Sequence, residues 1–124
     1  MKKKIIISIN PEHVKNIISG TKKYEYRTKA AKHDINKIII YETKPVRKIV
    51  AEAEVIDVLM MAPEDLWKET KSESGISKKH FDNYFKSREF GYAYKLGKIK
   101  VYEKPKSLNE FGLKFAPQSF VYVN

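Results

Sequence analysis

Segments with the composition of β-strands follow one another at short intervals along most of this chain, and this spacing limits the fold more than any other feature. Each segment is rich in isoleucine, valine, alanine or tyrosine, and most are joined by only a few residues. Parallel strands need a crossover of about a dozen residues or more, so the strands should pair mostly antiparallel. A turn at Gly97 separates two of them. The predicted strands are 4–9, 23–28, 37–43, 48–58, 91–96, 98–103 and 118–123.

Three short helices are expected between these strands. Asn10 is a suitable N-cap for the first helix, and Gly20 would end it in a left-handed conformation. The second helix begins at Pro63, and Ser77 caps the third. The predicted fold class is therefore α+β: a mostly antiparallel β-barrel or sheet with about three short helices on its rim, forming a single domain over residues 1–124.

The formal net charge of +10 is concentrated in the first part of the chain. Residues 1–50 hold 13 Lys and Arg against 4 Asp and Glu, whereas residues 51–124 hold 12 against 11. A one-sided positive field attracts polyanions, of which nucleic acid is the most common. The alternative is that lysine only keeps a small protein in solution.

Composition excludes several classes of protein and site. With 42% hydrophobic residues the chain can bury a core, which excludes a fully disordered protein. The lack of cysteine excludes a disulfide scaffold and a thiolate nucleophile. No apolar run reaches the ~18 residues of a membrane span, so we expect a cytoplasmic protein without membrane contact. The histidines lack the spacing of metal ligands, so we expect no metal or cofactor and predict that His13 and His80 face solvent on their helices.

The segment 20–27 carries the strongest chemical signal in the sequence. Glu25 and Arg27 are two residues apart in a predicted strand and should point to the same side, while Lys22 lies in the preceding turn and can reach that side. An arginine fork can hold a phosphate or a base edge, and a carboxylate can accept hydrogen bonds from a base. Two alternatives remain: a surface salt-bridge cluster on an edge strand, or a buried structural pair of Glu25 and Arg27.

The aromatic residues are expected to fall into two groups. Tyr24 and Tyr26 alternate with the charged residues of their strand and should face the core. Tyr41 and Trp67 are the better candidates for stacking on a base, which contributes roughly 1–3 kcal/mol per base, although Trp67 could instead pack in the core or at its rim. An apolar stripe on the third helix is assigned to the core and consists of Phe81, Tyr84 and Phe85.

The pattern Gly20-x-Lys22-x-x-Glu25-x-Arg27, placed after a strand and a helix, resembles the signature of the ASCH domain family, which belongs to the PUA-like β-barrel superfamily. The resemblance extends from about residue 5 to residue 122. It is carried by further short segments in the same order, namely 7–11, 41–46, 66–67, 75–77, 103–105 and 117–120.

This resemblance implies a stand-alone PUA-like barrel whose cleft beside the turn binds RNA or a modified nucleotide, with Gly20 as a structural residue of the motif. Lys22, Glu25 and Arg27 would contact the ligand, and further lysines would supply the wider positive field: Lys2, Lys3, Lys4, Lys23, Lys29, Lys32 and Lys37. Some relatives are fused to a helix-turn-helix domain and are described as predicted transcriptional regulators. A regulatory module that binds a protein partner is therefore a further hypothesis, and the sequence does not indicate an oligomeric state.

Some members of the family are enzymes, and the sequence leaves open whether this chain is one. One group resembling this fold removes the acetyl group from N4-acetylcytidine, and others are described as ribonucleases. In the amidohydrolase group a threonine, taken as the nucleophile, stands where this chain has Glu25. A carboxylate is a poor acyl acceptor in amide hydrolysis, so in a hydrolase Lys22 and Glu25 would instead act as an acid–base pair.

Overall fold

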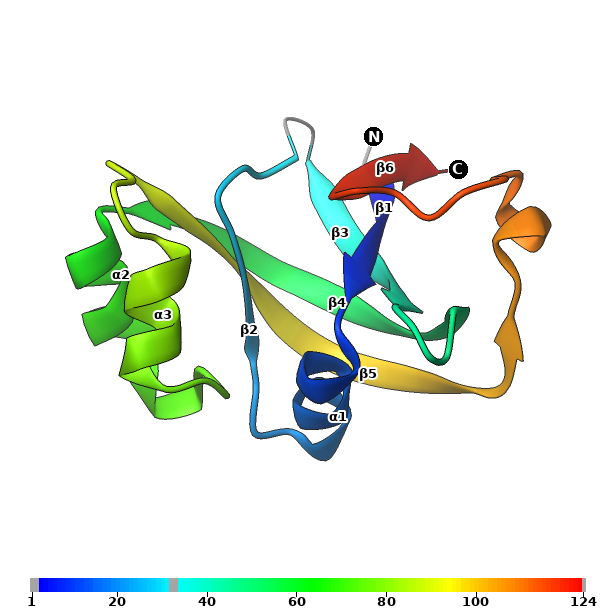
Figure 1. Ribbon diagram of the computed structural model, residues 1–124, viewed down its shortest axis with the longest axis horizontal. Helices are drawn as coiled ribbons and strands as arrows, with labels where there is room; N and C mark the ends of the chain where they lie inside the picture. Colours follow the sequence, from blue (N-terminus) through cyan, green and yellow to red (C-terminus); the bar gives the residue numbers. More distant parts are fainter. Residues whose placement is uncertain (1–2, 32–33, 124) are drawn as a thin grey trace.

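The computed structural model describes residues 3–31 and 34–123, which form a six-stranded sheet flanked by helices (Figure 1). The strand order is β2-β5-β4-β3-β1-β6; β1 and β3 are parallel, and the other neighbouring strands are antiparallel. The strands are β1 (Lys3–Ile9), β2 (Tyr24–Arg27), β3 (Ile35–Glu42), β4 (Lys48–Met61), β5 (Gly91–Lys106) and β6 (Phe120–Val123). The helices are α1 (Pro11–Ser19), α2 (Pro63–Thr70) and α3 (Lys78–Tyr84), with 3₁₀ turns at Lys71–Glu73 and Leu108–Phe111.

The predicted α+β fold with mostly antiparallel strands is confirmed. The sheet is barrel-like but open, because in the described part of the chain no backbone pairing joins its end strands β2 and β6. Helix α1 connects β1 to β2, while α2 and α3 connect β4 to β5 and lie together at one end of the molecule (Figure 1).

Strand β1 is buried on both faces, which explains its continuous run of isoleucines. Ile5 and Ile7 pack in one apolar cluster with Val14 and Ile17 of α1. Ile6, on the opposite face, belongs to a second cluster that the 3₁₀ turn Leu108–Phe111 helps to cover. A strand covered on both sides shows no alternation of polar and apolar residues.

Helices α2 and α3 cover the part of the sheet formed by β2 and β5. Tyr24 and Tyr26 are buried here among Leu66, Phe81 and Phe85, as the alternation in β2 predicted. The Tyr26 hydroxyl lies 2.6 Å from the Thr70 hydroxyl, so its polar end is satisfied inside the cluster. This packing fixes the face of β2 that carries the tyrosines and turns its charged residues to the other side.

The predicted turn at Gly97 is wrong, because Gly91–Lys106 is a single long strand. Ala53 pairs with Ile99 and Val55 with Leu96, so three steps along β5 oppose two along β4. Gly97 therefore lies at a β-bulge, an irregularity that glycine also favours. The sequence alone does not distinguish a bulge from a turn at this position, because both place a glycine between two apolar segments.

The helix ends agree with the sequence in position but not always in mechanism. Ser77 caps α3 as predicted, its hydroxyl accepting from the His80 amide at 3.1 Å, and Gly20 ends α1 at a φ of +88°. Asn10 stands at the N-cap of α1, but its side chain makes no capping bond. Its carboxamide oxygen accepts a hydrogen bond from the Thr43 hydroxyl at 3.2 Å instead.

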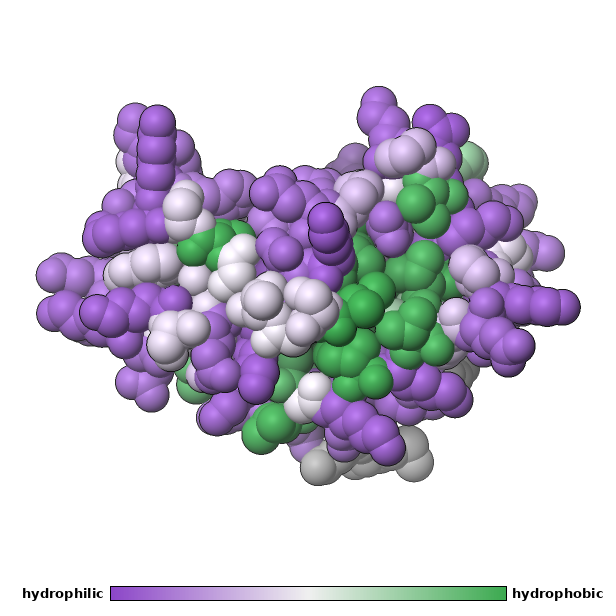
Figure 2. All heavy atoms as spheres, turned by 90° about the horizontal axis from the view of Figure 1, so that it is seen from below, coloured by the Kyte–Doolittle hydropathy of each residue, from purple (hydrophilic) through white to green (hydrophobic). Residues whose placement is uncertain are grey.

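Figure 2 shows the face that lies lowest in Figure 1, where hydrophilic side chains surround a central apolar area. Among the described residues, no helix has the length and apolar character needed to cross a membrane.

The backbone conformation of Gly97 predicts that alanine is tolerated there despite the bulge. Gly97 has no positive φ, and an added Cβ would approach the end of the Ile56 side chain at 3.0 Å. Ile56 is 63% exposed and can move aside, so Gly97→Ala should change the free energy of unfolding by at most about 0.5 kcal/mol. Gly112→Ala, at a φ of +76°, should cost about 1–2 kcal/mol. Urea denaturation of both variants tests this. An equal decrease in the free energy of unfolding in both would contradict the expectation for Gly97.

Candidate functional site

A cavity of about 460 Å³ lies where the end of β1, the start of α1, strand β2 and helix α3 meet. Most of the residues that line it have polar side chains, and they include Lys22 from the turn before β2 and both Glu25 and Arg27 from β2. The lining residues are Ser8, Ile9, Asn10, His13, Lys22, Glu25, Tyr26, Arg27, Thr43, Ile76, His80, Tyr84 and Gln118. Lys22, Glu25 and Arg27 therefore all line one cavity, as predicted, but the Lys22 ammonium turns toward Ser74 and away from the other two.

Lys22 is unusual because its side chain is almost completely buried, with 3% of the residue exposed. Its ammonium donates to the Ser74 carbonyl at 3.2 Å and lies 4.8 Å from the centre of the Tyr26 ring. Burial lowers the pKa of Lys22; the nearby Glu25 carboxylate opposes this shift, and Arg27 adds to it. Lys22 is thus a partly desolvated cation at the wall of the cavity. The attraction between this cation and an anion is stronger there than it would be in water.

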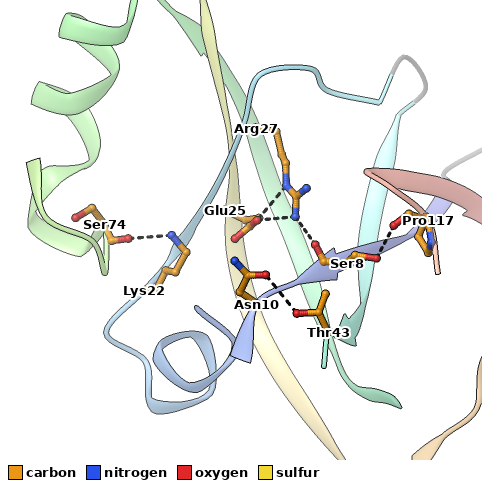
Figure 3. A network of polar contacts seen from close by, with 8 residues as sticks. All are labelled: Ser8, Asn10, Lys22, Glu25, Arg27, Thr43, Ser74 and Pro117. Carbon is orange, nitrogen blue, oxygen red and sulfur yellow. Dashed lines mark hydrogen bonds and ion pairs between the residues drawn. The ribbon is translucent and has the colours of Figure 1, made fainter. Parts of the chain in front are cut away.

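Glu25 and Arg27 form a buried ion pair. Both Nε and Nη2 of Arg27 lie within hydrogen-bond distance of one Glu25 oxygen, at 3.0 and 2.9 Å. Nη2 also donates to the Ser8 carbonyl at 2.8 Å, so the guanidinium ties β2 to β1 (Figure 3). The pair fixes the orientation of both groups, whereas Lys22 turns toward Ser74 (Figure 3). The alternative considered from the sequence, a salt-bridge cluster on the surface of an edge strand, is wrong, because the side chains of Glu25 and Arg27 are only 7% and 15% exposed.

Short polar contacts hold the remaining wall of the cavity in place. The Ser8 hydroxyl donates to the Pro117 carbonyl at 2.7 Å, and the Ser8 amide donates to the Ser119 carbonyl at 3.4 Å. These bonds hold the segment before β6, which carries Gln118, against the end of β1. The contact between Asn10 and Thr43 joins the start of α1 to the end of β3 in the same way (Figure 3).

The prediction that His13 faces solvent is wrong, because His13 is half-buried, whereas His80 is exposed as predicted; both residues line the cavity. Their rings meet edge to face with centroids 5.3 Å apart, although His13 lies on α1 and His80 on α3. Nδ1 of His13 is buried and has no hydrogen-bond partner among the described residues. Burial, followed by the charge of Lys22, lowers the pKa of His13 below 6.5, while Glu25 opposes the shift. His33 lies outside the described residues.

Tyr84 was assigned to the core, but it is 40% exposed and its side chain lines the cavity. Its ring packs edge to face on Phe85, with centroids 4.8 Å apart, and Phe85 is buried as expected. The apolar stripe identified α3 correctly. The stripe did not distinguish Tyr84, at the rim of the cluster, from the buried Phe81 and Phe85, because the helix covers the sheet only in part.

Tyr41 and Trp67 are not among the described residues that line this cavity. Tyr41 is 7% exposed and packs with Ile6, Ile39 and Ile49 on the other side of the sheet. Trp67 packs on Phe81 at 5.0 Å between ring centroids, within the cluster beneath α2 and α3.

The lysines expected to supply a wider field are only partly available for it. Lys23 pairs with Glu73 at 3.3 Å, and Lys37 pairs with Glu52 at 2.6 Å. Lys2 and Lys32 lie outside the described residues. Within the described ranges, no three His, Asp or Glu side chains gather as metal ligands would.

Residues 7–106 match the family model of the ASCH domain. The chain belongs to the ASCH domain family. The crystal structure of ASCH from Zymomonas mobilis superposes with a TM-score of 0.89 at 26% identity, covering 98% of this chain and 88% of that one. The fold described above is therefore the ASCH fold, and the segment 20–27 with its cavity lies inside the matched region.

Two curated relatives differ widely in overall length. An ASCH domain-containing ribonuclease from Zymomonas mobilis is 29% identical over 77% of this chain and 65% of its own length. ATP synthase subunit alpha of Ureaplasma parvum serovar 3 is 28% identical over 98% of this chain, which spans only 15% of that protein.

The environment of His13 predicts how its pKa responds to nearby charges. NMR titration of wild type should give a His13 pKa below 6.5, and Lys22→Met should raise it because a nearby positive charge is removed. Glu25→Gln should lower it further, since the carboxylate favours the imidazolium. Lys15→Met, at an exposed position of α1, is the control and should leave it unchanged. An unchanged His13 pKa in the Lys22→Met variant would refute this electrostatic description.

Proposed function

We propose that this cavity binds a nucleotide unit of RNA. One observation carries the proposal: an acid and two cations from a single turn line one cavity of about 460 Å³ together with several neutral polar side chains. Small-molecule sites commonly have volumes of roughly 300–1,000 Å³, which suits a nucleotide. Membership of the ASCH domain family and the net charge of +10 support the same class of ligand.

Each group has a distinct part in the proposed complex. Lys22 supplies a partly desolvated positive charge for a phosphate, and Arg27 adds the N–H groups that Glu25 and Ser8 do not use. Glu25 keeps one oxygen outside its bonds to Arg27, and this oxygen can accept from a base amine. The exposed ring of Tyr84 offers a stacking surface at the rim. Stacking of a base on Trp67 stays a prediction, whereas Tyr41 is buried in the core and offers no face to a base.

A ribonuclease is the second candidate function. It is supported by the relative from Zymomonas mobilis named as an ASCH domain-containing ribonuclease. Two histidines line the cavity, and imidazole is a common general acid or base in catalysis. The acid–base pair of Lys22 and Glu25 considered for a modified-nucleoside hydrolase is less well supported, because Glu25 bonds to Arg27 and Lys22 to the Ser74 carbonyl.

Binding of a short single-stranded RNA should depend on Lys22 and on salt. Fluorescence anisotropy across a salt series should give a linear fall of log K with log salt for wild type. Lys22→Met keeps the buried stem but removes the charge, so it should bind at least about tenfold more weakly, with a salt slope reduced by about 0.7. Lys71→Met, at an exposed position beside α2, is the matched control and should bind nearly as wild type does.

Equal affinities and slopes for Lys22→Met and Lys71→Met would refute the assignment of this cavity. Thermal melting shows whether each variant is folded. Incubation of wild type with N4-acetylcytidine tests the hydrolase alternative, for which release of acetate is the expected product. Absence of any RNA binding by wild type would favour a module that binds a protein partner.

A further inference from the structure

A second cavity of about 410 Å³ adjoins the first, and the two share part of their walls. Three residues line both of them: His13, Ile76 and His80. The second cavity extends away from Lys22 and Arg27 along the start of α3 and the Gly75–Ser77 segment. A ligand longer than one nucleotide can therefore run from one cavity into the other past the two imidazole rings.

The two imidazoles meet the geometric requirement for acting on the same group. Their centroids lie 5.3 Å apart at an interplanar angle of 79°, and both residues line the two cavities where these adjoin. Nδ1 of His13 is buried and lacks a partner among the described residues, although it lies in a polar wall where such groups are normally bonded. Because Nδ1 is buried, a ligand at this junction would contact His13 through Nε2.

We propose that His13 and His80 are the proton-transferring residues of an RNA-cleaving site at the junction of the two cavities. The proposal rests on the binding of RNA proposed above, and it adds the reaction and the residues that perform it. The substrate is a ribose–phosphate linkage with a free 2′-hydroxyl, held by Lys22 and Arg27 on one side of the junction.

The reaction is an intramolecular transfer that needs no other reactant. The 2′-oxygen attacks the adjacent phosphorus and forms a new P–O bond, while one imidazole accepts the 2′-hydroxyl proton. The P–O bond to the 5′-oxygen of the next nucleotide breaks, and the other imidazole, in its protonated form, donates a proton to that oxygen. The products are a 2′,3′-cyclic phosphate and a free 5′-hydroxyl. The charge of Lys22 stabilises the negative charge that gathers on the phosphate oxygens in the transition state.

The surroundings assign the two roles. His13 is half-buried, and the charge of Lys22 disfavours its protonated form, so it is the base. Two carboxylates oppose this effect, Glu12 on its own helix and Glu25 on β2, and His80 from α3 is the remaining titratable group that faces it. His80, the other imidazole at the junction, is exposed to solvent and takes the part of the acid.

The test measures cleavage and binding separately, on the same RNA and in the presence of EDTA. Wild type should cleave single-stranded RNA and leave 2′,3′-cyclic phosphate ends by mass spectrometry, and should leave the 2′-O-methyl analogue intact. His13→Gln and His80→Asn should each reduce the cleavage rate at least about 100-fold and keep wild-type affinity within a factor of about three. Lys79→Ala, beside His80 on the exposed side of α3, should cleave at the wild-type rate.

Each contrary outcome has a distinct meaning. If wild type binds RNA but does not cleave it, or if both histidine variants cleave at the wild-type rate, this proposal is overturned and the binding site stands. Cleavage of the 2′-O-methyl analogue would also overturn the mechanism. If wild type does not bind RNA at all, both proposals fail. Because His80 is exposed, His80→Asn should fold normally and decides the question even if His13→Gln is unstable.

Discussion

The guanidinium of Arg27 connects two strands that the backbone leaves apart. Strand β2 lies at one end of the sheet and β1 lies near the other, so no ladder of hydrogen bonds joins them in the described chain. Arg27 bonds to Glu25 on its own strand and to the Ser8 carbonyl on β1. This contact closes the open side of the sheet through side chains, and the space left beside it is the cavity. The position of the site therefore depends on one buried cation.

Stability alone does not account for the burial of so much charge at this point. A buried ion pair loses much of its Coulombic gain to desolvation, and apolar replacements of similar volume are often as stable. Here an ion pair lies beside a buried ammonium whose pKa is lowered chiefly by burial. Fixed, partly desolvated charges around a cavity interact strongly with a charged ligand and need little rearrangement to do so. The same residues thus form a structural ion pair and part of the wall of the proposed binding site.

Sequence reasoning succeeded where the signal was local. The alternation of tyrosines and charges in β2 gave both the core face and the face that carries Glu25 and Arg27. It failed at Gly97, because a bulge and a turn have the same local composition. It also failed for His13, which is half-buried rather than facing solvent, since helix periodicity places a residue on a face but does not say what that face meets. His13 and His80 are 67 positions apart and come together only where α1 and α3 meet at the wall of the cavity.

The sequence by itself determined the helices, most of the strands, the family motif and the set of charged residues at the turn after α1. These features follow from side-chain periodicity and backbone preference over a few residues. Only the tertiary structure decided that Lys22 is buried, that Arg27 reaches Ser8, and that two distant histidines share a wall. Those facts depend on strand order and on how helices pack over the sheet, which are set by contacts between residues far apart in the chain.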